Sequence, residues 1–429
     1  MLDINLFRDN PEYIKKDLKR RKDKDKINKV DEIIKLDSDW RRKKTEVDSL
    51  RAKRNELNIE IQNLKKSKKT AISQIEKSKK ILKKLEEAED LMSYYKNSRD
   101  TLVKIMPNLM HESVPFGKDE KDNVEVKKFG KIRKLKIKNH VEACENLGLL
   151  DFERSNKLAG HGFYFLKGDL ALLNQALIRF AIDKMVKNRF LYVEPPLMMR
   201  KKAYEGVTDL SDFEDVMYKI EDEDLYLIAT SEHPLVGQFM DEVLDEKILP
   251  FKLCSYSMCF RKEVGSRGID TKGLFRTHQF NKVEQVIICK PKDSWLLLKE
   301  LVKNAEELMQ HLKLPYRVVN ICTGDLGIVA AKKYDIEVWS PRLEDYSEVG
   351  SISNCTDYQA RGLNIKYGKV GGDKFIAHTL NGTALATSRI LVAILENYQN
   401  EDGSIDIPEV LATYMGGVKK LRKPQDYFL

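Results

Sequence analysis

The first hundred residues carry an apolar pattern that is typical of long helices. Between residues 33 and 64, apolar side chains recur at alternating steps of three and four, with Lys43 and Arg54 interrupting, and no Gly or Pro falls in this run. The apolar positions are Ile33, Leu36, Trp40, Val47, Leu50, Leu57, Ile61 and Leu64. This spacing predicts one amphipathic helix, and its 32 residues would extend about 48 Å.

A second helix should follow the first and fold back along it. The polar stretch KKSKKTAIS is expected to form the tip, and apolar positions then recur from Ile75 to Leu102, with a phase slip near Leu85. Pro107 would end this helix. Two consecutive helices with a short polar connection favour an antiparallel coiled coil. A short helical lead-in over residues 1–26, with a helix start at Asn10-Pro11, precedes the pair.

Beyond this arm the pattern changes to a mixture of helices and strands. Residues 107–126 contain two prolines and a glycine and are predicted to be a linker. Residues 169–190 have apolar side chains at helical spacing, which predicts a helix packed on a sheet. The runs FLYVEPPLM and YDIEVW are typical of strands. The chain is therefore expected to be an α+β protein with a helical N-terminal part.

Charge and cysteine content narrow the possible partners and compartment. The net charge is +9, and residues 41–70 hold eleven Lys and Arg against four Asp and Glu. Two interpretations of this basic helix remain open, because it could grip an RNA backbone or be an ordinary solvated face of a coiled coil. The six cysteines show no paired spacing, and neither a signal peptide nor a membrane-spanning run is seen. These features predict a cytoplasmic protein.

The stretch from Cys259 to Glu284 carries the chemistry that stands out most. It is expected to form a hairpin around a Gly-rich turn, with Arg261 and Glu263 on one flank and Arg276, Phe280 and Glu284 on the other. Guanidinium groups suit phosphate oxygens, an aromatic face suits a purine, and carboxylates suit an amino group. The alternative is a hairpin with surface ion pairs.

The residues of this stretch resemble a sequence motif of a known family. Phe-Arg-x-Glu, a loop and Arg-xxx-Phe-xxx-Glu resemble the second signature motif of class II aminoacyl-tRNA synthetases, and the string GLFRTHQFNKVE narrows the resemblance to seryl-tRNA synthetases. The strings YLIATSEHPL, EDYSEVGSISNC and HTLNGTALATSR are also similar to that family, and the helix and strand that lead to Pro196 resemble the loose first motif. No P-loop or Rossmann fingerprint competes with this interpretation.

The resemblance implies a site for ATP, serine and Mg²⁺. Catalysis would rest on Arg261, Glu263, Arg276 and Arg389. ATP would be bound by Arg261, Lys262, Glu263, Arg276, Thr277, Phe280, Glu348, Val349, Gly350, Ser351 and Arg389. Serine would be bound by Thr230, Ser231, Glu232, Arg261, Glu284 and Thr383, and the metal by Glu348 and Ser351. The family usually has Ser-Ser-Cys-Ser where this chain has Gly350-Ser351-Ile352-Ser353, which leaves the shape of the expected ATP/Mg loop open.

The resemblance also implies a fold and an activity. It implies a class II catalytic body at 107–429, built on an antiparallel β-sheet with flanking helices, and a tRNA-binding helical domain with the coiled-coil arm at 1–106. The body would make seryl-adenylate from serine and ATP and transfer serine to tRNA(Ser), as a homodimer, with tRNA(Sec) left open as a second acceptor. Two alternatives remain: a related ligase with a non-tRNA acceptor, and a non-catalytic RNA-binding relative.

Overall fold

The computed structural model describes residues 1–133, 137–208, 214–263 and 273–424. Gly265 and Gly268 of the expected hairpin turn lie outside these ranges. The chain divides at Met106 and Pro107 into two compact units, Leu2–Met106 and Pro107–Leu429, the latter together with Met1. Each unit is built around its own interior, so each is described by itself.

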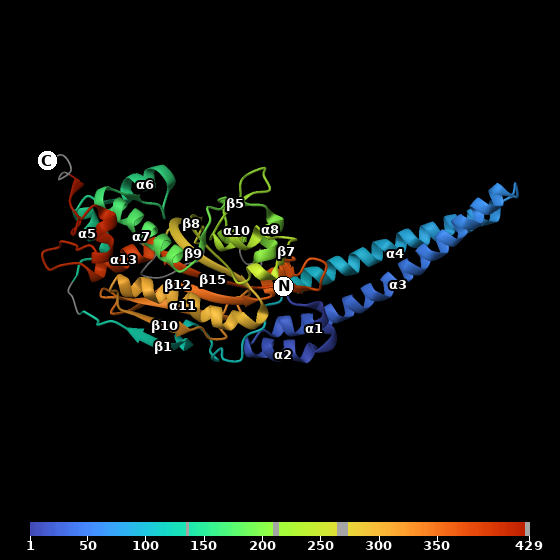
Figure 1. The fold of residues 1–429 in the computed structure, drawn as a ribbon, viewed down its shortest axis with the longest axis horizontal. Coiled ribbons are helices and arrows are strands. Elements are labelled where there is room, and N and C mark those ends of the chain that lie inside the picture. The colour runs from blue at the N-terminus through green and yellow to red at the C-terminus, as the bar shows by residue number, and fades with distance from the viewer. Residues whose placement is uncertain (134–136, 209–213, 264–272, 425–429) are drawn as a thin grey trace. The chain divides into compact units, whose positions relative to one another are not determined.

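The N-terminal unit is a helical hairpin with two short helices before it. Its helices are α1 (Ile4–Asp9), α2 (Pro11–Arg20), α3 (Lys24–Lys66) and α4 (Ile72–Lys104). Asn10 caps α2 and Pro11 is its first residue, as the sequence predicted. The arm helices α3 and α4 run antiparallel (Figure 1), since Arg51 pairs with Glu89 at 2.7 Å while Glu60 and Gln74 meet nearer the tip. The predicted coiled coil is therefore confirmed.

A buried acidic side chain holds the arm helices together away from the tip. Asp37 of α3 is 1% exposed and accepts hydrogen bonds from Arg8 of α1 and Arg99 of α4, each at 2.8 Å. The Arg99 guanidinium also lies 4.7 Å from the centre of the Trp40 ring. Burial would raise the pKa of Asp37, but the two guanidinium groups hold it below its ordinary value. A buried charge with such specific partners fixes the register of α3 against α4.

The second unit is built on an eight-stranded sheet in the order β1-β10-β11-β12-β15-β9-β8-β4. The strands are β1 (Val124–Phe129), β4 (Leu191–Tyr192), β8 (Phe251–Phe260), β9 (Gln279–Cys289), β10 (Tyr316–Asn320), β11 (Lys332–Ser340), β12 (Asp345–Thr356) and β15 (His378–Ala386). All neighbours pair antiparallel except β4 with β8. The predicted α+β class with an antiparallel sheet is confirmed.

Smaller elements surround this sheet. The remaining strands are β2 (Leu150–Asp151), β3 (Phe165–Leu166), β5 (Met198–Met199), β6 (Tyr226–Leu227), β7 (Val243–Asp245), β13 (Lys366–Gly368) and β14 (Lys374–Ile376). The helices are α5 (His140–Asn146), α6 (Phe152–Ala159), α7 (Gly168–Lys187), α8 (Lys201–Val207), α10 (Glu232–Gly237), α11 (Ser294–His311), α12 (Tyr358–Gly362), α13 (Thr387–Asn397) and α14 (Glu409–Ala412).

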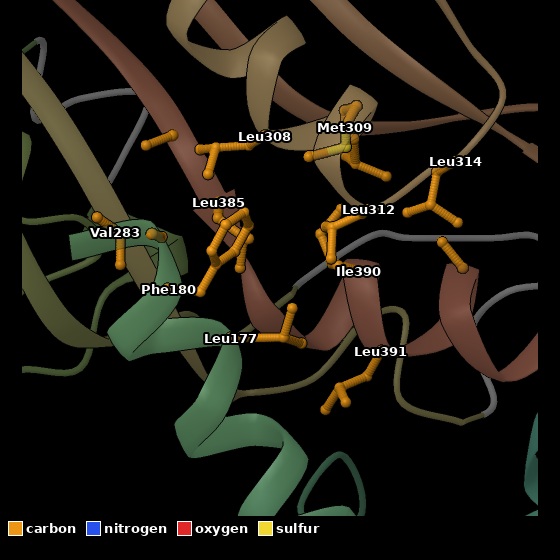
Figure 2. Close-up of a cluster of buried hydrophobic side chains, with 14 of the residues drawn as sticks. Leu177, Phe180, Val283, Leu308, Met309, Leu312, Leu314, Leu385, Ile390 and Leu391 are labelled. Carbon is orange, nitrogen blue, oxygen red and sulfur yellow. The ribbon is translucent and has the colours of Figure 1, made fainter. Parts of the chain in front are cut away.

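The main core lies between one face of the sheet and the helices α7, α11 and α13. Figure 2 shows Leu177 and Phe180 of α7 near Val283 of β9 and Leu385 of β15. The odd-numbered side chains of β9 thus face the helices, while Phe280, Lys282 and Glu284 face the opposite side. Around Phe280, Lys282 and Glu284 this opposite face is polar and carries the functional residues, whereas Val286 and Ile288 further along β9 pack into a second apolar cluster.

One predicted segment boundary differs from the structure. The expected linker 107–126 runs into β1, because Val124 already pairs with Asn320 of β10. The linker is also anchored, since the buried Asn108 amide donates to the carbonyls of Val329 and Cys355 at 2.9 and 2.8 Å. The amide thus supplies both carbonyls with a hydrogen-bond donor. No helix in the described ranges is both long and apolar enough to cross a membrane.

Candidate active site

A cavity of about 530 Å³ opens on the polar face of the large sheet. Strands β9, β12 and β15 form its floor, and the ends of α8, α10 and α13 and the segment that follows β8 contribute its walls. Of the residues predicted for the site, those lining it are Thr230, Glu232, Arg261, Glu263, Arg276, Thr277, Phe280, Glu284, Glu348, Val349, Gly350, Ser351, Thr383 and Arg389. Residues as far apart in sequence as Thr230 and Arg389 thus meet in one cavity.

Two of the predicted residues do not line this cavity. The Lys262 ammonium lies 5.9 Å from the centre of the Tyr218 ring, and its backbone N–H donates to the carbonyl of Val216 at 2.8 Å. Ser231 is wholly buried, and within the described part of the chain its hydroxyl has no hydrogen-bond partner. Ser231 directly precedes α10, so its side chain turns into the protein while Glu232, the next residue, turns to the cavity.

Arginines dominate one end of the cavity, which we call the arginine end (Arg261, Glu263, Arg276, Glu348 and Arg389). The Arg389 Nη1 lies 3.0 Å from Glu348 Oε1, and the Arg276 Nη1 lies 3.5 Å from Glu263 Oε2. The Arg261 guanidinium lies 5.2 Å from the centre of the Phe280 ring, and its Nε donates to the carbonyl of Ala229 at 3.2 Å. This end offers forked donors and a flat aromatic face, which suits a nucleoside phosphate.

The prediction that a regular hairpin aligns these side chains is wrong. Strand β8 ends at Phe260 and β9 begins at Gln279, so Arg261, Glu263 and Arg276 all lie outside the strands. Glu263 has a φ of +49°, which a strand does not allow. Only Phe280 and Glu284 share a strand face. The side chains converge through turns at the strand ends and not through strand periodicity.

Glu348 and Ser351 reach the same cavity because β12 contains a bulge. The two residues are three apart, so in a regular strand they would face opposite sides. The register against β11 shifts here: Gly350 pairs with Ile336 and Glu348 with Glu337, which leaves Val349 as the extra residue. One extra residue reverses the alternation locally. The carboxylate and the hydroxyl thereby share one face.

The expected ATP/Mg loop is in fact part of this strand. Residues 350–353 lie within β12, so the prediction of a loop was wrong. The presence of glycine at position 350 has a structural reason, since a Cβ there would come 3.0 Å from the Cβ of Thr383 on the adjacent strand. Ile352 pairs with Gly382 and fills the space that this glycine leaves. The two departures from the usual family letters are thus part of the contact between β12 and β15.

Two carboxylates and one lysine form the opposite end, which we call the carboxylate end (Thr230, Glu232, Lys282, Glu284 and Thr383). The Lys282 ammonium lies 2.5 Å from Glu284 Oε2 and donates to the Thr230 hydroxyl at 2.7 Å. The Thr383 hydroxyl donates to Glu284 at 3.5 Å. Glu232 accepts hydrogen bonds from Gln359 at 2.7 Å and Asn381 at 2.9 Å. This end offers acceptors for an ammonium group and for a hydroxyl.

Sequence reasoning missed Lys282, Asn381 and Gln359. Lys282 lies midway between Phe280 and Glu284 on one strand face, so period-two alternation was a usable signal for it. Asn381 likewise lies two residues before Thr383 on β15. Gln359 belongs to α12 and reaches Glu232 across 127 positions of sequence, for which the sequence carries no local signal.

Burial gives the carboxylates of the cavity different acidities. Burial, reinforced by the nearby Glu284, raises the pKa of Glu232 to about 7, and burial also raises the pKa of Glu284 despite its contact with Lys282. The Glu348 side chain is 43% exposed; its partial removal from bulk solvent would raise its pKa, but the charges of Arg389 and Lys333 hold the pKa of Glu348 below its ordinary value. Burial lowers the pKa of His233 to about 3, so this histidine of α10 is neutral.

The side-chain oxygen atoms of Glu348 and Ser351 suit a hard divalent cation. A carboxylate with a lowered pKa and a hydroxyl on one strand face are oxygen ligands of the kind that Mg²⁺ accepts beside phosphate oxygens and water. Across the described residues, no three His, Cys, Asp or Glu side chains group as a metal-ligand cluster. All six cysteines are buried free thiols.

Known proteins share this architecture. The family model "tRNA synthetase class II core domain (G, H, P, S and T)" matches residues 217–398, and "Seryl-tRNA synthetase N-terminal domain" matches residues 1–110. The serine–tRNA ligase of Methanocella arvoryzae is 51% identical over 425 residues, covering 98% of this chain and 100% of that protein.

Solved structures agree with this match. The crystal structure of seryl-tRNA synthetase from Pyrococcus horikoshii complexed with ATP has a TM-score of 0.91 at 47% identity and covers 99% of this chain and 100% of that one. The cytoplasmic serine–tRNA ligase of Naegleria fowleri in complex with AMP has a TM-score of 0.86 at 36% identity, covering 99% of both chains. The fold is therefore that of a class II aminoacyl-tRNA synthetase. Within that class, the chain belongs to the seryl-tRNA synthetase family.

Proposed function

We propose that this chain is a serine–tRNA ligase, which activates L-serine with ATP and transfers the seryl group to the 3′ end of tRNA(Ser). The observation that carries the proposal is the division of one cavity into an arginine end and a carboxylate end, in a chain that is 51% identical to a serine–tRNA ligase over 98% of its length. Two charged substrates can then be held with their reacting atoms close together.

The arginine end is assigned to ATP. Phe280 would stack on adenine and Glu263 would accept from the adenine amino group. Arg261 would hold the α-phosphate, while Arg276 and Arg389 would take the terminal phosphates. Because Arg276 and Arg389 now pair with carboxylates, incoming phosphate oxygens would replace those partners with stronger, bidentate ones. The ATP and AMP complexes of the two relatives support this assignment.

A magnesium ion is assigned to Glu348 and Ser351. When bound there, it would supply positive charge between the phosphate oxygens and offset the negative charge that builds up on the leaving pyrophosphate. The Glu348 carboxylate would exchange its contact with Arg389 for the cation. Thr277, Val349 and Gly350 line the same part of the cavity and would bound the nucleotide.

The carboxylate end is assigned to serine. Glu232, Glu284 and the Thr230 segment would receive the ammonium group, and Thr383 would face the hydroxymethyl group. Serine's carboxylate would then point to Arg261 of the arginine end. A pocket that hydrogen-bonds the serine hydroxyl discriminates against alanine, since polar groups would otherwise be left unpaired.

The reaction needs no side-chain nucleophile. A carboxylate oxygen of serine would attack the α-phosphorus of ATP, forming the O–P bond of seryl-adenylate as the bond to pyrophosphate breaks. The 3′-hydroxyl of the terminal tRNA ribose would then attack the activated carbonyl, forming the ester as AMP leaves with the bonding electrons. The protein's share is positioning and charge stabilisation by Arg261, Arg276 and Arg389.

The helical unit is assigned to tRNA binding. Of the eleven Lys and Arg in residues 41–70, all but Lys43 and Arg54 have exposed side chains. An exposed basic hairpin suits contacts to an RNA backbone, which would read the shape of tRNA(Ser) more than its sequence. The acceptor could extend to tRNA(Sec), which a charging assay decides. As in the Naegleria relative, we place the protein in the cytoplasm.

A homodimer is the proposed assembly. The segment that resembles the first class II motif, α7 with β4, leaves Leu172, Val186 and Leu191 about half exposed. Apolar side chains left uncovered on one helix and its following strand suit a second copy of the chain.

One experiment tests the proposed function directly. ATP–pyrophosphate exchange is measured with each of the twenty amino acids, and serine tRNA is then charged with the amino acid that supports exchange. Exchange with serine and charging are expected. Exchange without charging would favour the ligase with another acceptor, and absence of exchange with every amino acid would favour the non-catalytic relative.

A further inference from the structure

A buried polar cluster lies behind the cavity, and the proposed reaction does not use it directly. Its centre is Glu396, which lies on α13 seven residues after Arg389 and is fully buried. Its carboxylate accepts hydrogen bonds from His140 Nδ1 at 3.2 Å, from the Ser340 hydroxyl at 2.5 Å and from Arg342 Nε at 3.0 Å. Burial would raise the pKa of Glu396, but these three donors hold it below its ordinary value.

The other ring nitrogen of His140 contacts the backbone next to the cavity. The Leu274 N–H donates to His140 Nε2 at 3.4 Å. A backbone amide can only donate, so Nε2 is the acceptor and the ring hydrogen is on Nδ1, where it meets Glu396. The imidazole, itself 1% exposed, therefore connects α13 to the chain at Leu274.

Gly273 shows how closely the backbone approaches this ring. Its φ is +105°, and a Cβ at this position would lie 2.5 Å from His140 Nε2. A residue with a side chain would both strain the backbone and collide with the imidazole. The ring thus fixes the position of residues 273 and 274 against α5 and α13.

The fixed backbone leads directly to residues of the arginine end. Phe275 and Arg276 follow Leu274 and line the cavity. The Arg389 guanidinium lies 5.2 Å from the centre of the Phe275 ring. Arg276 and Arg389 are thereby connected to the same pair of buried groups, one through the backbone after Leu274 and the other through α13.

We propose that His140 and Glu396 are positioning residues for ATP, which set the segment Leu274–Arg276 and the start of α13 at the spacing that the phosphates require. The inference rests on the proposed function, because it takes Arg276 and Arg389 to be phosphate-binding. Neither His140 nor Glu396 lines the cavity. The serine pocket has its own contacts through Lys282, Gln359 and Asn381, so the pair acts on ATP and not on serine.

The test compares two histidine variants of the full-length protein. His140→Phe keeps a ring and removes both hydrogen bonds. The matched control is His378→Phe, since His378 is half-buried, hydrogen-bonds Ser294 at 3.0 Å and lies outside the cavity. The ATP dissociation constant is measured by calorimetry without serine, and KM for ATP and for serine are measured in the exchange reaction. The thermal midpoint of each variant reports any general loss of stability.

The expected result is a selective loss of ATP affinity. A small misplacement of the two arginines should weaken ATP binding and raise KM for ATP about tenfold or more in His140→Phe, with KM for serine within about twofold and His378→Phe unchanged at both substrates. His140→Gln, which keeps an acceptor for the Leu274 N–H, should recover part of the loss. If His140→Phe does not fold, Glu396→Gln and His140→Gln are measured in its place, with the same expectation of a selective ATP defect in Glu396→Gln.

Two outcomes would overturn the inference. One is unchanged ATP affinity in a folded His140→Phe or Glu396→Gln variant. The other is an equal loss toward ATP and serine that follows the fall in the thermal midpoint, which would show a structural role only. Failure of the proposed function gives a different signature, since the wild-type chain would then support no serine-dependent exchange, while its direct ATP affinity would still test the pair.

Discussion

The two ends of the cavity hold their charges in different ways. At the arginine end, the Arg276 side chain is 40% exposed and the Glu348 side chain 43% exposed, so their ion pairs lie beside solvent. At the carboxylate end, the Lys282 and Glu284 side chains are 8% and 2% exposed. Half-exposed ion pairs exchange partners at little cost, whereas a buried charge that loses its partner is strongly destabilising.

The difference indicates how each substrate is selected. Phosphates can displace the carboxylates at the arginine end, because the arginines gain a partner with more charge. The carboxylate end contains two carboxylates, Glu232 and Glu284, and one lysine, Lys282. Its net charge is therefore −1 when both carboxylates are ionised. An ammonium group supplies the balancing positive charge. Three predictions test whether the two ends differ in this way.

The largest effect is expected at the arginine end. Arg389→Ala should lower kcat/KM for ATP in pyrophosphate exchange by about 10²- to 10³-fold, as loss of a donor to developing charge does elsewhere, with tRNA binding retained. Arg317→Ala is the control, since Arg317 pairs with Glu337 at 2.6 Å in the same sheet but does not line the cavity. Equal losses in exchange and in tRNA binding would contradict the assignment.

A smaller effect is expected at the hydroxyl side of the carboxylate end. Thr383→Val keeps the shape of the side chain and removes the hydroxyl that donates to Glu284. The preference for serine over alanine in exchange should fall by about 10²-fold, because a hydroxyl-binding site owes much of its selectivity to such groups. Thr323→Val, which removes a hydroxyl bonded to Gly117 outside the cavity, should leave the preference unchanged. An unaltered preference in Thr383→Val would remove Thr383 from the serine pocket.

The smallest effect is a pH dependence at the same end. Because the pKa of Glu232 is raised to about 7, Glu232 is protonated below that pH and loses its attraction for an ammonium group. KM for serine should therefore rise as the pH falls below about 7, by at most roughly tenfold for each pH unit. Glu232→Gln should raise KM at high pH and flatten the profile. A wild-type profile that matches that of the variant would assign the ammonium site to other residues.

Much of the cavity could be predicted from sequence because its residues lie in short strings with distinctive spacing. Arg261, Glu263, Arg276 and Phe280 come from one such string, and Arg389 follows a strand that turns into a helix, as expected. The long apolar repeat likewise predicted the arm, since helical periodicity is a local property.

The rest depended on contacts that no local pattern encodes. Asp37 meets Arg99 across 62 positions, and Glu232 meets Gln359 across 127. Side-chain direction at the ends of β8 and β9 depends on turns, so the two-residue period did not apply to Arg261 or Glu263. Ser231 was predicted to bind serine for the same reason, since the sequence does not show that the start of α10 turns its hydroxyl away from the cavity.

The bulge at Val349 has a consequence for how this chain can change. Substitutions beside it, such as those at Gly350 and Ile352, alter contacts with β15 but leave the alternation of β12 unchanged. Loss of a single residue from β12 is a different kind of change. A loss outside the segment 348–351 that removed the bulge would leave Glu348 and Ser351 three apart in a regular strand, where they would face opposite sides of the sheet. We therefore expect this strand to tolerate substitutions far better than insertions or deletions, and its length to be the quantity that evolution and protein engineering must keep.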